Sequence, residues 1–225
     1  MNHGFALFCG TFFAMICSWW VFIFGAQQQI GKMTPQPQPD ENGPLYPVTM
    51  LGTVHQGLEV YRASGCAACH TRVVRSTDVP RWGKRITVAP DYLYEQPVLL
   101  GTQRIGPDLA NVGARQRDAT WHLLHLYDPS SVAPGSKMPA YKFLFEKRKM
   151  GHAPAAQALK LSGAAAPEAG FEIVPKPEAL ALLAFLLNQH FENDLFEAPL
   201  PASERAVKPA GTNAPAPGAT NSPAK

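Results

Sequence analysis

Two cysteines and a histidine that could act together stand in the C-x-x-C-H motif of residues 66–70. This spacing is the attachment signature of a c-type haem. The thiols of Cys66 and Cys69 would add covalently to the vinyl groups, and the adjacent His70 is then placed to bind the iron from the proximal side. The motif occurs once, so the sequence predicts one covalently bound c-type haem.

Two other chemistries use the same spacing, a zinc site and a redox-active dithiol. A zinc site would need a second pair of Cys or His at ligand spacing, but the other cysteines, Cys9 and Cys17, lie in an apolar N-terminal run. A thioredoxin-like motif normally follows a strand and opens a helix. Residues 54–61 instead read as a helix that runs into a loop, which favours haem.

A second iron ligand must approach from the opposite face of the haem. The candidates are Met138, Met150, His122, His125 and His152. Met138 is favoured because Gly135 and Pro139 flank it in a fixed loop, whereas Met150 adjoins a charged run at 146–149. An ordinary core or surface role is the simpler one for His122 and His125. Methionine–histidine ligation raises the reduction potential and leaves no open iron position, so catalysis at this iron is disfavoured.

A Gly-Pro pair follows at residues 106 and 107, and a proximal histidine usually donates its second ring N–H to a carbonyl that such a loop can present. Residues 106–115 resemble the G-P-x-L…G-x-R loop of mono-haem class I cytochromes c. In that family the proline carbonyl accepts a hydrogen bond from the proximal histidine, and the arginine lies near a haem propionate. The resemblance implies these roles for Pro107 and Arg115.

The full pattern is more particular than a generic cytochrome c. Its segments, in order, are residues 69–75 (CHTRVVR), 81–83 (RWG), 101–109 (GTQRIGPDL), 121–126 (WHLLHL) and 138–141 (MPAY). It resembles the mono-haem, membrane-anchored subunit of cbb3-type cytochrome c oxidases, the C-family haem–copper oxygen reductases. The resemblance covers most of residues 1–145 and the leucine-rich segment near 180–190. The alanine-rich stretch 153–170 and the Pro-Ala tail depart from it.

That resemblance implies a non-catalytic subunit with a class I cytochrome c-like domain. In the family, electrons pass from a dihaem cytochrome c subunit or a soluble cytochrome c to a low-spin b haem in the catalytic haem–copper subunit, which reduces oxygen. Two other functions remain open: the small cytochrome c subunit of a nitric oxide reductase, and a free-standing anchored electron shuttle. The RWG and WHLLHL segments favour the oxidase over the reductase.

Residues 5–24 carry no charged side chain, and about 20 apolar residues at ~1.5 Å each span a bilayer core. A cleaved signal peptide is the alternative, but the run is long and has neither a basic n-region nor a good cleavage site. We expect a retained anchor in the bacterial inner membrane, with the N-terminus cytoplasmic and the haem domain periplasmic. Small residues could form a face for another membrane helix: Cys9, Gly10, Ala14, Cys17 and Ser18.

The rest of the chain divides by composition. A proline-rich linker at 32–47 follows an anchor at 1–31, the cytochrome domain occupies 48–196, and a disordered Pro/Ala-rich tail covers 197–225. Helices are expected at 53–63, at 118–127 and at 177–191, with few strands, and the second of these would be capped by Asp118 and stop at Asp128-Pro129. The fold class is therefore mainly α with long irregular loops. The formal net charge of +3 favours neither a nucleic acid nor an acidic substrate.

A basic cluster follows the haem motif, and it allows two interpretations. Its members are Arg72, Arg75, Arg81, Lys84 and Arg85. They could form a solvated face, or they could pair with haem propionates or with acidic groups of the catalytic subunit. Trp82 stands among them and is not expected to be fully exposed, which suggests an interface or a contact with the haem edge.

Overall fold

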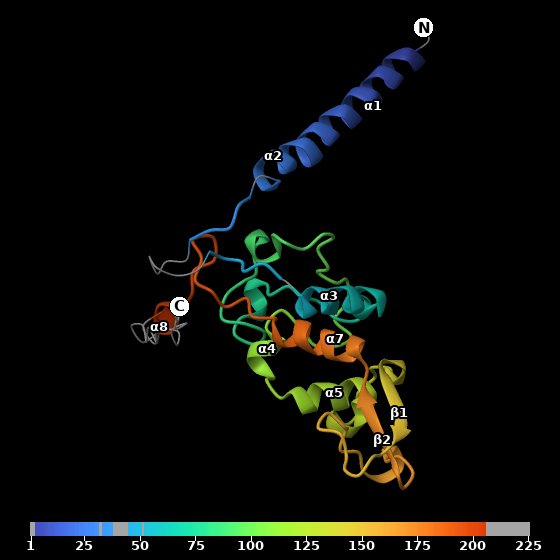
Figure 1. Cartoon of the computed structure of the whole chain (residues 1–225). Helices are drawn as coiled ribbons and strands as arrows, with labels where there is room; N and C mark the ends of the chain where they lie inside the picture. The colour runs from blue at the N-terminus through green and yellow to red at the C-terminus, as the bar shows by residue number, and fades with distance from the viewer. Residues whose placement is uncertain (1–2, 32, 38–44, 51, 206–225) are drawn as a thin grey trace, which may run out of the picture.

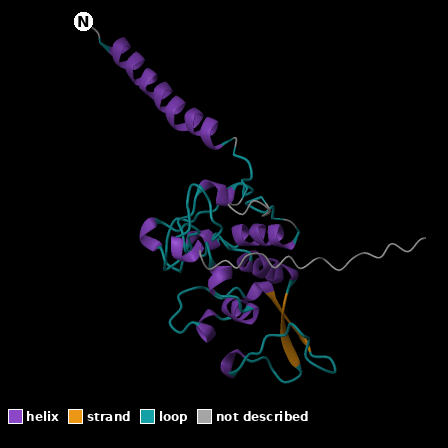
Figure 2. Ribbon diagram, turned by 90° about the vertical axis from the view of Figure 1, so that its left-hand side faces the viewer, coloured by secondary structure: helices purple, strands orange, loops and turns teal. Residues whose placement is uncertain are grey.

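The structure is a computed structural model that describes residues 3–31, 33–37, 45–50 and 52–205. A long N-terminal helix stands away from a folded domain (Figure 1, Figure 2). It consists of α1 (Gly4–Trp19), a π-helical segment (Trp20–Gly25) and α2 (Ala26–Ile30). These 27 residues have a mean hydropathy of 2.0 in their most apolar window and none is buried. At ~1.5 Å per residue the helix is long enough to cross a bilayer, and it is compatible with a single-pass anchor.

Two packed helices form the centre of the domain, α3 (Thr53–Ala63) and α7 (Pro177–Leu187). Gly57 lets them approach closely, because a Cβ at this position would overlap the carbonyl oxygen of Ala181. Beside this contact the rings of Tyr61 and Phe185 lie 5.3 Å apart, and both residues are fully buried.

The expected helix at 53–63 is confirmed, but the one expected at 177–191 ends four residues early, at Leu187. The residues that follow use their polar groups for long-range contacts. The carbonyl oxygen of Gln189 accepts from the backbone N–H of Gly113, and the N–H of Phe191 donates to Asn111 Oδ1. These contacts draw the chain away from the helix axis.

The remaining helices are shorter. They are α4 (Val112–Arg115), α5 (Ala119–Tyr127), α6 (Pro129–Val132) and α8 (Ala202–Arg205). The expected cap of α5 is confirmed, because Asp118 Oδ1 accepts from the N–H of Thr120 at 2.8 Å. The helix stops before Pro129, as Asp128-Pro129 predicted.

A two-stranded antiparallel sheet lies at the end of the domain opposite the N-terminal helix (Figure 1, Figure 2). It pairs β1 (Phe145–Lys149) with β2 (Phe171–Pro175). The charged side chains of β1 are exposed, as expected for residues 146–149. The alanine-rich connection is not purely a surface insertion, because Leu159 is buried and its N–H donates to the carbonyl oxygen of Ile173.

The chain between α3 and α4 is irregular and contains only short 3₁₀ turns. These turns are Cys66–Ala68, Ser76–Asp78 and Ala89–Tyr92. Two more 3₁₀ turns follow later in the chain, Lys142–Leu144 and Gly163–Ala165. The regular structure of the domain is therefore mostly helical, with few strands and long loops, as the sequence predicts.

Two members of the basic cluster hold these loops together from inside. Arg72 is fully buried and forms a double hydrogen bond with Glu95, and Arg85 does the same with Asp91. Both proposed interpretations of the cluster, a solvated face and a set of partners for propionates or another subunit, are therefore wrong for Arg72 and Arg85. The carboxylates that pair with these two arginines follow them later in the chain, at Glu95 and Asp91.

The other cluster members are exposed. Arg75 pairs with Asp78 and Lys84 with Glu204. The Arg81 guanidinium lies 4.6 Å from the centre of the Trp82 ring, and Trp82 is half-buried, as expected.

The chain segments before and after the domain both contact it. Gln36 and Tyr46 exchange two backbone hydrogen bonds of 2.8 Å, and the buried Tyr46 donates its hydroxyl to Asp91 at 2.6 Å. The end of the expected 32–47 linker thus packs on the domain. Residues 38–44 of the linker and 206–225 of the expected disordered tail lie outside the described residues, whereas Ala198 is buried.

Candidate haem-binding site

One pocket between the helices gathers most of the residues that the sequence selected. It is lined by Cys66, His70, Pro107, Arg115 and Met138, and by apolar side chains of α4, α5 and α7. Cys69 is half-buried and does not line the pocket. The pocket thus combines the residues for which we predict thioether, axial and propionate contacts.

A short 3₁₀ turn after α3 positions the cysteines. Gly65 has a φ of +71°, which reverses the chain at the end of the helix, and Cys66 accepts through its carbonyl oxygen from the N–H groups of Cys69 and His70. Burial raises the pKa of the Cys66 thiol to about 11. The thiol is therefore protonated at neutral pH.

The ring of His70 is fixed by the Gly-Pro loop. Its Nδ1 atom lies 2.8 Å from the carbonyl oxygen of Pro107, to which it donates, so Nε2 is the nitrogen left to bind a metal. Gly106 packs against the same ring, and a Cβ there would overlap the Cε1 atom of His70. The contact proposed for Pro107 is thus present, and the glycine before it is required by the close approach.

The structure narrows the choice of the opposite ligand. Met150 and His152 do not line the pocket, whereas Met138, His122 and His125 do. His122 already uses Nε2, which lies 2.9 Å from the carbonyl oxygen of Gln116. Burial lowers the pKa of both His122 and His125, so both are neutral at pH 7. Met138 remains our prediction, and His125 is the alternative that shares its pocket.

Two buried polar atoms in the described part of the chain lack a hydrogen-bond partner, Tyr61 Oη and His125 Nδ1. Both residues line this pocket. Buried polar groups without partners are rare in folded proteins and often mark a ligand or water. Tyr61 was not among the residues predicted for the site, because no local signal in the chain distinguishes it from a core aromatic residue.

The remaining lining fits a large apolar ring with acidic substituents. Five leucine and valine side chains form an apolar part of the wall: Leu109, Val112, Leu126, Leu182 and Leu186. At the edge, the Arg115 guanidinium lies 5.0 Å from the centre of the Trp82 ring and donates to the carbonyl oxygen of Asp108. The cavity encloses about 130 Å³, less than the ~300 Å³ of small cofactor sites, so the side chains around it would separate when a porphyrin enters.

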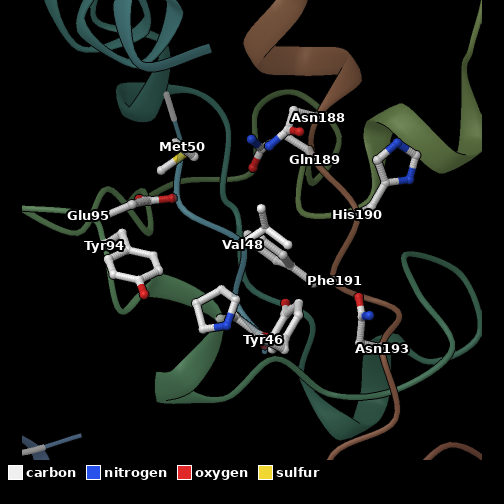
Figure 3. Close-up of a pocket in the computed structure, with 12 residues that line it drawn as sticks. Tyr46, Val48, Met50, Tyr94, Glu95, Asn188, Gln189, His190, Phe191 and Asn193 are labelled. Atoms are coloured by element: carbon white, nitrogen blue, oxygen red, sulfur yellow. The ribbon is translucent and has the colours of Figure 1, made fainter. Parts of the chain in front are cut away.

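A second cavity of about 200 Å³ lies between the segment after the linker and the chain that leaves α7 (Figure 3). Figure 3 shows Tyr46, Val48, Glu95 and Gln189 around it. Its carboxylates are already paired, Glu95 with Arg72 and Asp91 with Arg85. We assign no ligand to this cavity.

The zinc alternative finds no support in the geometry. Over residues 3–31, 33–37, 45–50 and 52–205, no group of three or more His, Cys, Asp or Glu side chains could hold a metal ion. Cys9 and Cys17 are exposed on the N-terminal helix, where they could not complete a site around Cys66.

The family model described as "Cytochrome C oxidase, mono-heme subunit/FixO" matches residues 10–169. The match includes the C-x-x-C-H motif, the Gly-Pro loop and Met138, and it ends before α7. A comparison with curated proteins returned no match.

Proposed function

The chain belongs to the FixO family of mono-haem cytochrome c oxidase subunits, and we propose that it passes electrons to the catalytic haem–copper subunit of a cbb3-type oxidase. The observation that carries the proposal is the pocket in which Cys66, His70 and Met138 meet, with His70 Nδ1 on the Pro107 carbonyl oxygen. Residues that could hold an iron porphyrin from both faces suit an electron carrier better than an open catalytic site.

Each residue that the sequence selected for haem binding has its own part in this proposed function. Cys66 and Cys69 would hold one haem through thioether bonds, His70 and Met138 would be the axial ligands, and Arg115 would face a propionate. The haem would supply one-electron transfer through its ferric and ferrous states. Because the protein would occupy both axial positions, oxygen reduction belongs to the partner subunit.

The chain itself sets the conditions for electron transfer. Pro107 holds the His70 ring in one orientation and fixes its tautomer. Apolar side chains would cover part of the haem, and His122 and His125 stay neutral, so neither would add a positive charge to the pocket. A ligand set that changes little between oxidation states is what rapid transfer requires.

We further propose that the helix of α1 and α2 anchors the subunit in the bacterial inner membrane, with the N-terminus in the cytoplasm and the haem domain in the periplasm. Electrons would come from a dihaem cytochrome c subunit or a soluble cytochrome c. Of the basic cluster, only the exposed members Arg75, Arg81 and Lys84 remain available for contact with a partner subunit.

Purification of the full chain from membranes in mild detergent tests the function. We expect c haem together with b haem and copper. Co-purification of b haem with non-haem iron would instead indicate a nitric oxide reductase subunit, and c haem alone would indicate a free-standing shuttle.

Covalent attachment is tested by haem staining of a denaturing gel. The double variant Cys66→Ala/Cys69→Ala should lose the stain, while Cys9→Ala/Cys17→Ala should keep it. Equal staining of both double variants would contradict the assignment of the motif.

A further inference from the structure

We propose that Asp108 is a positioning residue for His70. Its buried carboxylate ties the Gly-Pro loop to the segment after the C-x-x-C-H motif, and this holds the Pro107 carbonyl oxygen against His70 Nδ1. The inference rests on the proposed function, because it concerns the residue that would bind the haem iron. The side chain of Asp108 makes no hydrogen bond to His70 and does not line the pocket, where only its backbone carbonyl oxygen accepts from Arg115, so the role of the carboxylate is indirect.

The carboxylate of Asp108 is fully buried and makes three short contacts. Oδ2 accepts from Thr71 Oγ1 at 2.6 Å and from the N–H of Val73 at 2.9 Å, and Oδ1 accepts from the N–H of Ala110 at 2.9 Å. Two of these donors, Thr71 and Val73, lie one and three residues after His70 in the chain. The carboxylate therefore joins the histidine segment to the loop that carries the acceptor of its ring.

Two backbone hydrogen bonds flank the critical carbonyl of Pro107. The N–H of Gly106 donates to the carbonyl oxygen of Cys69 at 3.0 Å, and the N–H of Leu109 donates to that of Thr71 at 2.8 Å. Pro107 lies between these two bonds and has no N–H of its own. The side chain of the next residue, Asp108, supplies a further connection at this point.

Arg104 completes the network and compensates the buried charge. Its Nε donates to Thr71 Oγ1 at 2.7 Å, its Nη1 donates to Asp78 at 2.8 Å, and its Nη2 lies 3.5 Å from Asp108 Oδ2. The Thr71 hydroxyl thus accepts from the arginine and donates to the aspartate. Burying a carboxylate is costly unless it is paired and hydrogen-bonded, and here its three hydrogen-bond donors, Thr71, Val73 and Ala110, belong to the two segments that it joins.

The expected consequence concerns the basicity of the histidine. A firm acceptor on the second ring nitrogen makes an imidazole a stronger iron donor, which favours ferric over ferrous iron. If the loop loosens, the equilibrium between the two states should shift toward the reduced form. A change worth about one hydrogen bond gives a roughly fivefold shift, or about 40 mV at ~59 mV per tenfold change for one electron.

The test uses the haem-loaded full-length subunit in detergent and three variants. Asp108→Asn removes the charge, Thr71→Val removes the hydroxyl and keeps all charges, and Thr71→Ser restores the hydroxyl. Asp91→Asn is the matched control, because Asp91 is equally buried, pairs with Arg85 and accepts from the Tyr46 hydroxyl, away from the histidine segment. The measurements are the reduction potential and, by NMR with labelled histidine, the rate of solvent exchange of the His70 Nδ1 proton.

We expect Asp108→Asn and Thr71→Val to raise the potential and to speed proton exchange at least tenfold, with Thr71→Ser and Asp91→Asn close to the wild type. If Asp108→Asn does not accumulate, the comparison of Thr71→Val with Thr71→Ser decides whether the inference holds. If the potential rises only in Asp108→Asn and exchange of the His70 Nδ1 proton is unchanged in Thr71→Val, Asp108 acts through its charge and not through the connection it makes. That result would overturn the inference. Equal effects in Asp91→Asn would also overturn it. A wild-type chain without covalent haem would instead refute the proposed function.

Discussion

Replacing Glu95 by glutamine should destabilise the domain far more than the loss of a surface ion pair, because it leaves the Arg72 guanidinium charged and buried. The side chains of Arg72 and Glu95 are 0% and 2% exposed and share two hydrogen bonds. Four aromatic rings surround the guanidinium at 5.0–5.9 Å from their centres. Gln189 accepts from Arg72 Nε at 3.0 Å. Water cannot replace the missing carboxylate without disturbing this packing.

The size of the effect follows from this burial. Breaking a buried ion pair by removing one partner costs about 3–5 kcal/mol. Since the amide of glutamine still accepts one hydrogen bond, we expect about 3 kcal/mol for Glu95→Gln. At ~2–4 °C per kcal/mol for a chain of this size, Tm should fall by roughly 6–12 °C. The exposed pair of Lys84 and Glu204, with side chains 46% and 40% exposed, should be worth ~1 kcal/mol or less.

Urea unfolding of the detergent-solubilised subunit, followed by circular dichroism, compares Glu95→Gln with Lys84→Gln. Replacing both partners of the buried pair, Arg72→Met with Glu95→Leu, should recover much of the lost stability. If Glu95→Gln and Lys84→Gln destabilise equally, then water reaches Arg72. The arginine would again be a candidate for contact with propionates or with another subunit.

Three further outcomes are expected. Gly106→Ala should prevent normal haem incorporation, because the added Cβ would overlap the ring of the proximal histidine; absorption spectra of the purified subunit check this. Met138→His should keep a low-spin haem but lower its potential and abolish the near-infrared band of methionine ligation, whereas Met150→His should change neither. The hydrogen bond from Arg104 holds the pKa of Asp78 well below its usual value, so the unfolded chain takes up this proton first as the pH falls. The stability that Asp78 contributes is complete above about pH 5 and is lost progressively as the pH falls further, toward the lowered pKa of the folded state. Asp78→Asn should flatten this part of the curve of unfolding free energy against pH.

The features that the sequence predicted well are local. The helix at 53–63 follows from spacing over a few turns, and the start of α5 follows from an aspartate at its N-cap position. The C-x-x-C-H motif is likewise a local signal, and the close approach of Pro107 to His70 was expected because a glycine and a proline fix the loop that carries it.

The features that it missed depend on residues far apart in the chain. Glu95 follows Arg72 by 23 positions, and nothing in the local pattern indicates that this carboxylate and not water will meet the arginine. The early end of α7 has the same origin, because residues 188–191 make contacts near residues 111–113. The role of Asp108 was also hidden, since its position in the G-P-x-L pattern is the one that the pattern leaves free.

The core and the haem pocket share their walls, which explains how so little regular structure forms a stable domain. The side chains of Val112, Leu126, Leu182 and Leu186 belong both to the main hydrophobic cluster and to the lining of the pocket. A bound porphyrin would therefore bury further apolar surface of the core itself, at about 25 cal/mol per Å². On the other side of α3 and α7, the buried pairs of Arg72 and Arg85 fix loops that have few backbone hydrogen bonds of their own. The irregular segments are thus held by ion pairs at one end and by the cofactor site at the other, and His70 lies where the two meet.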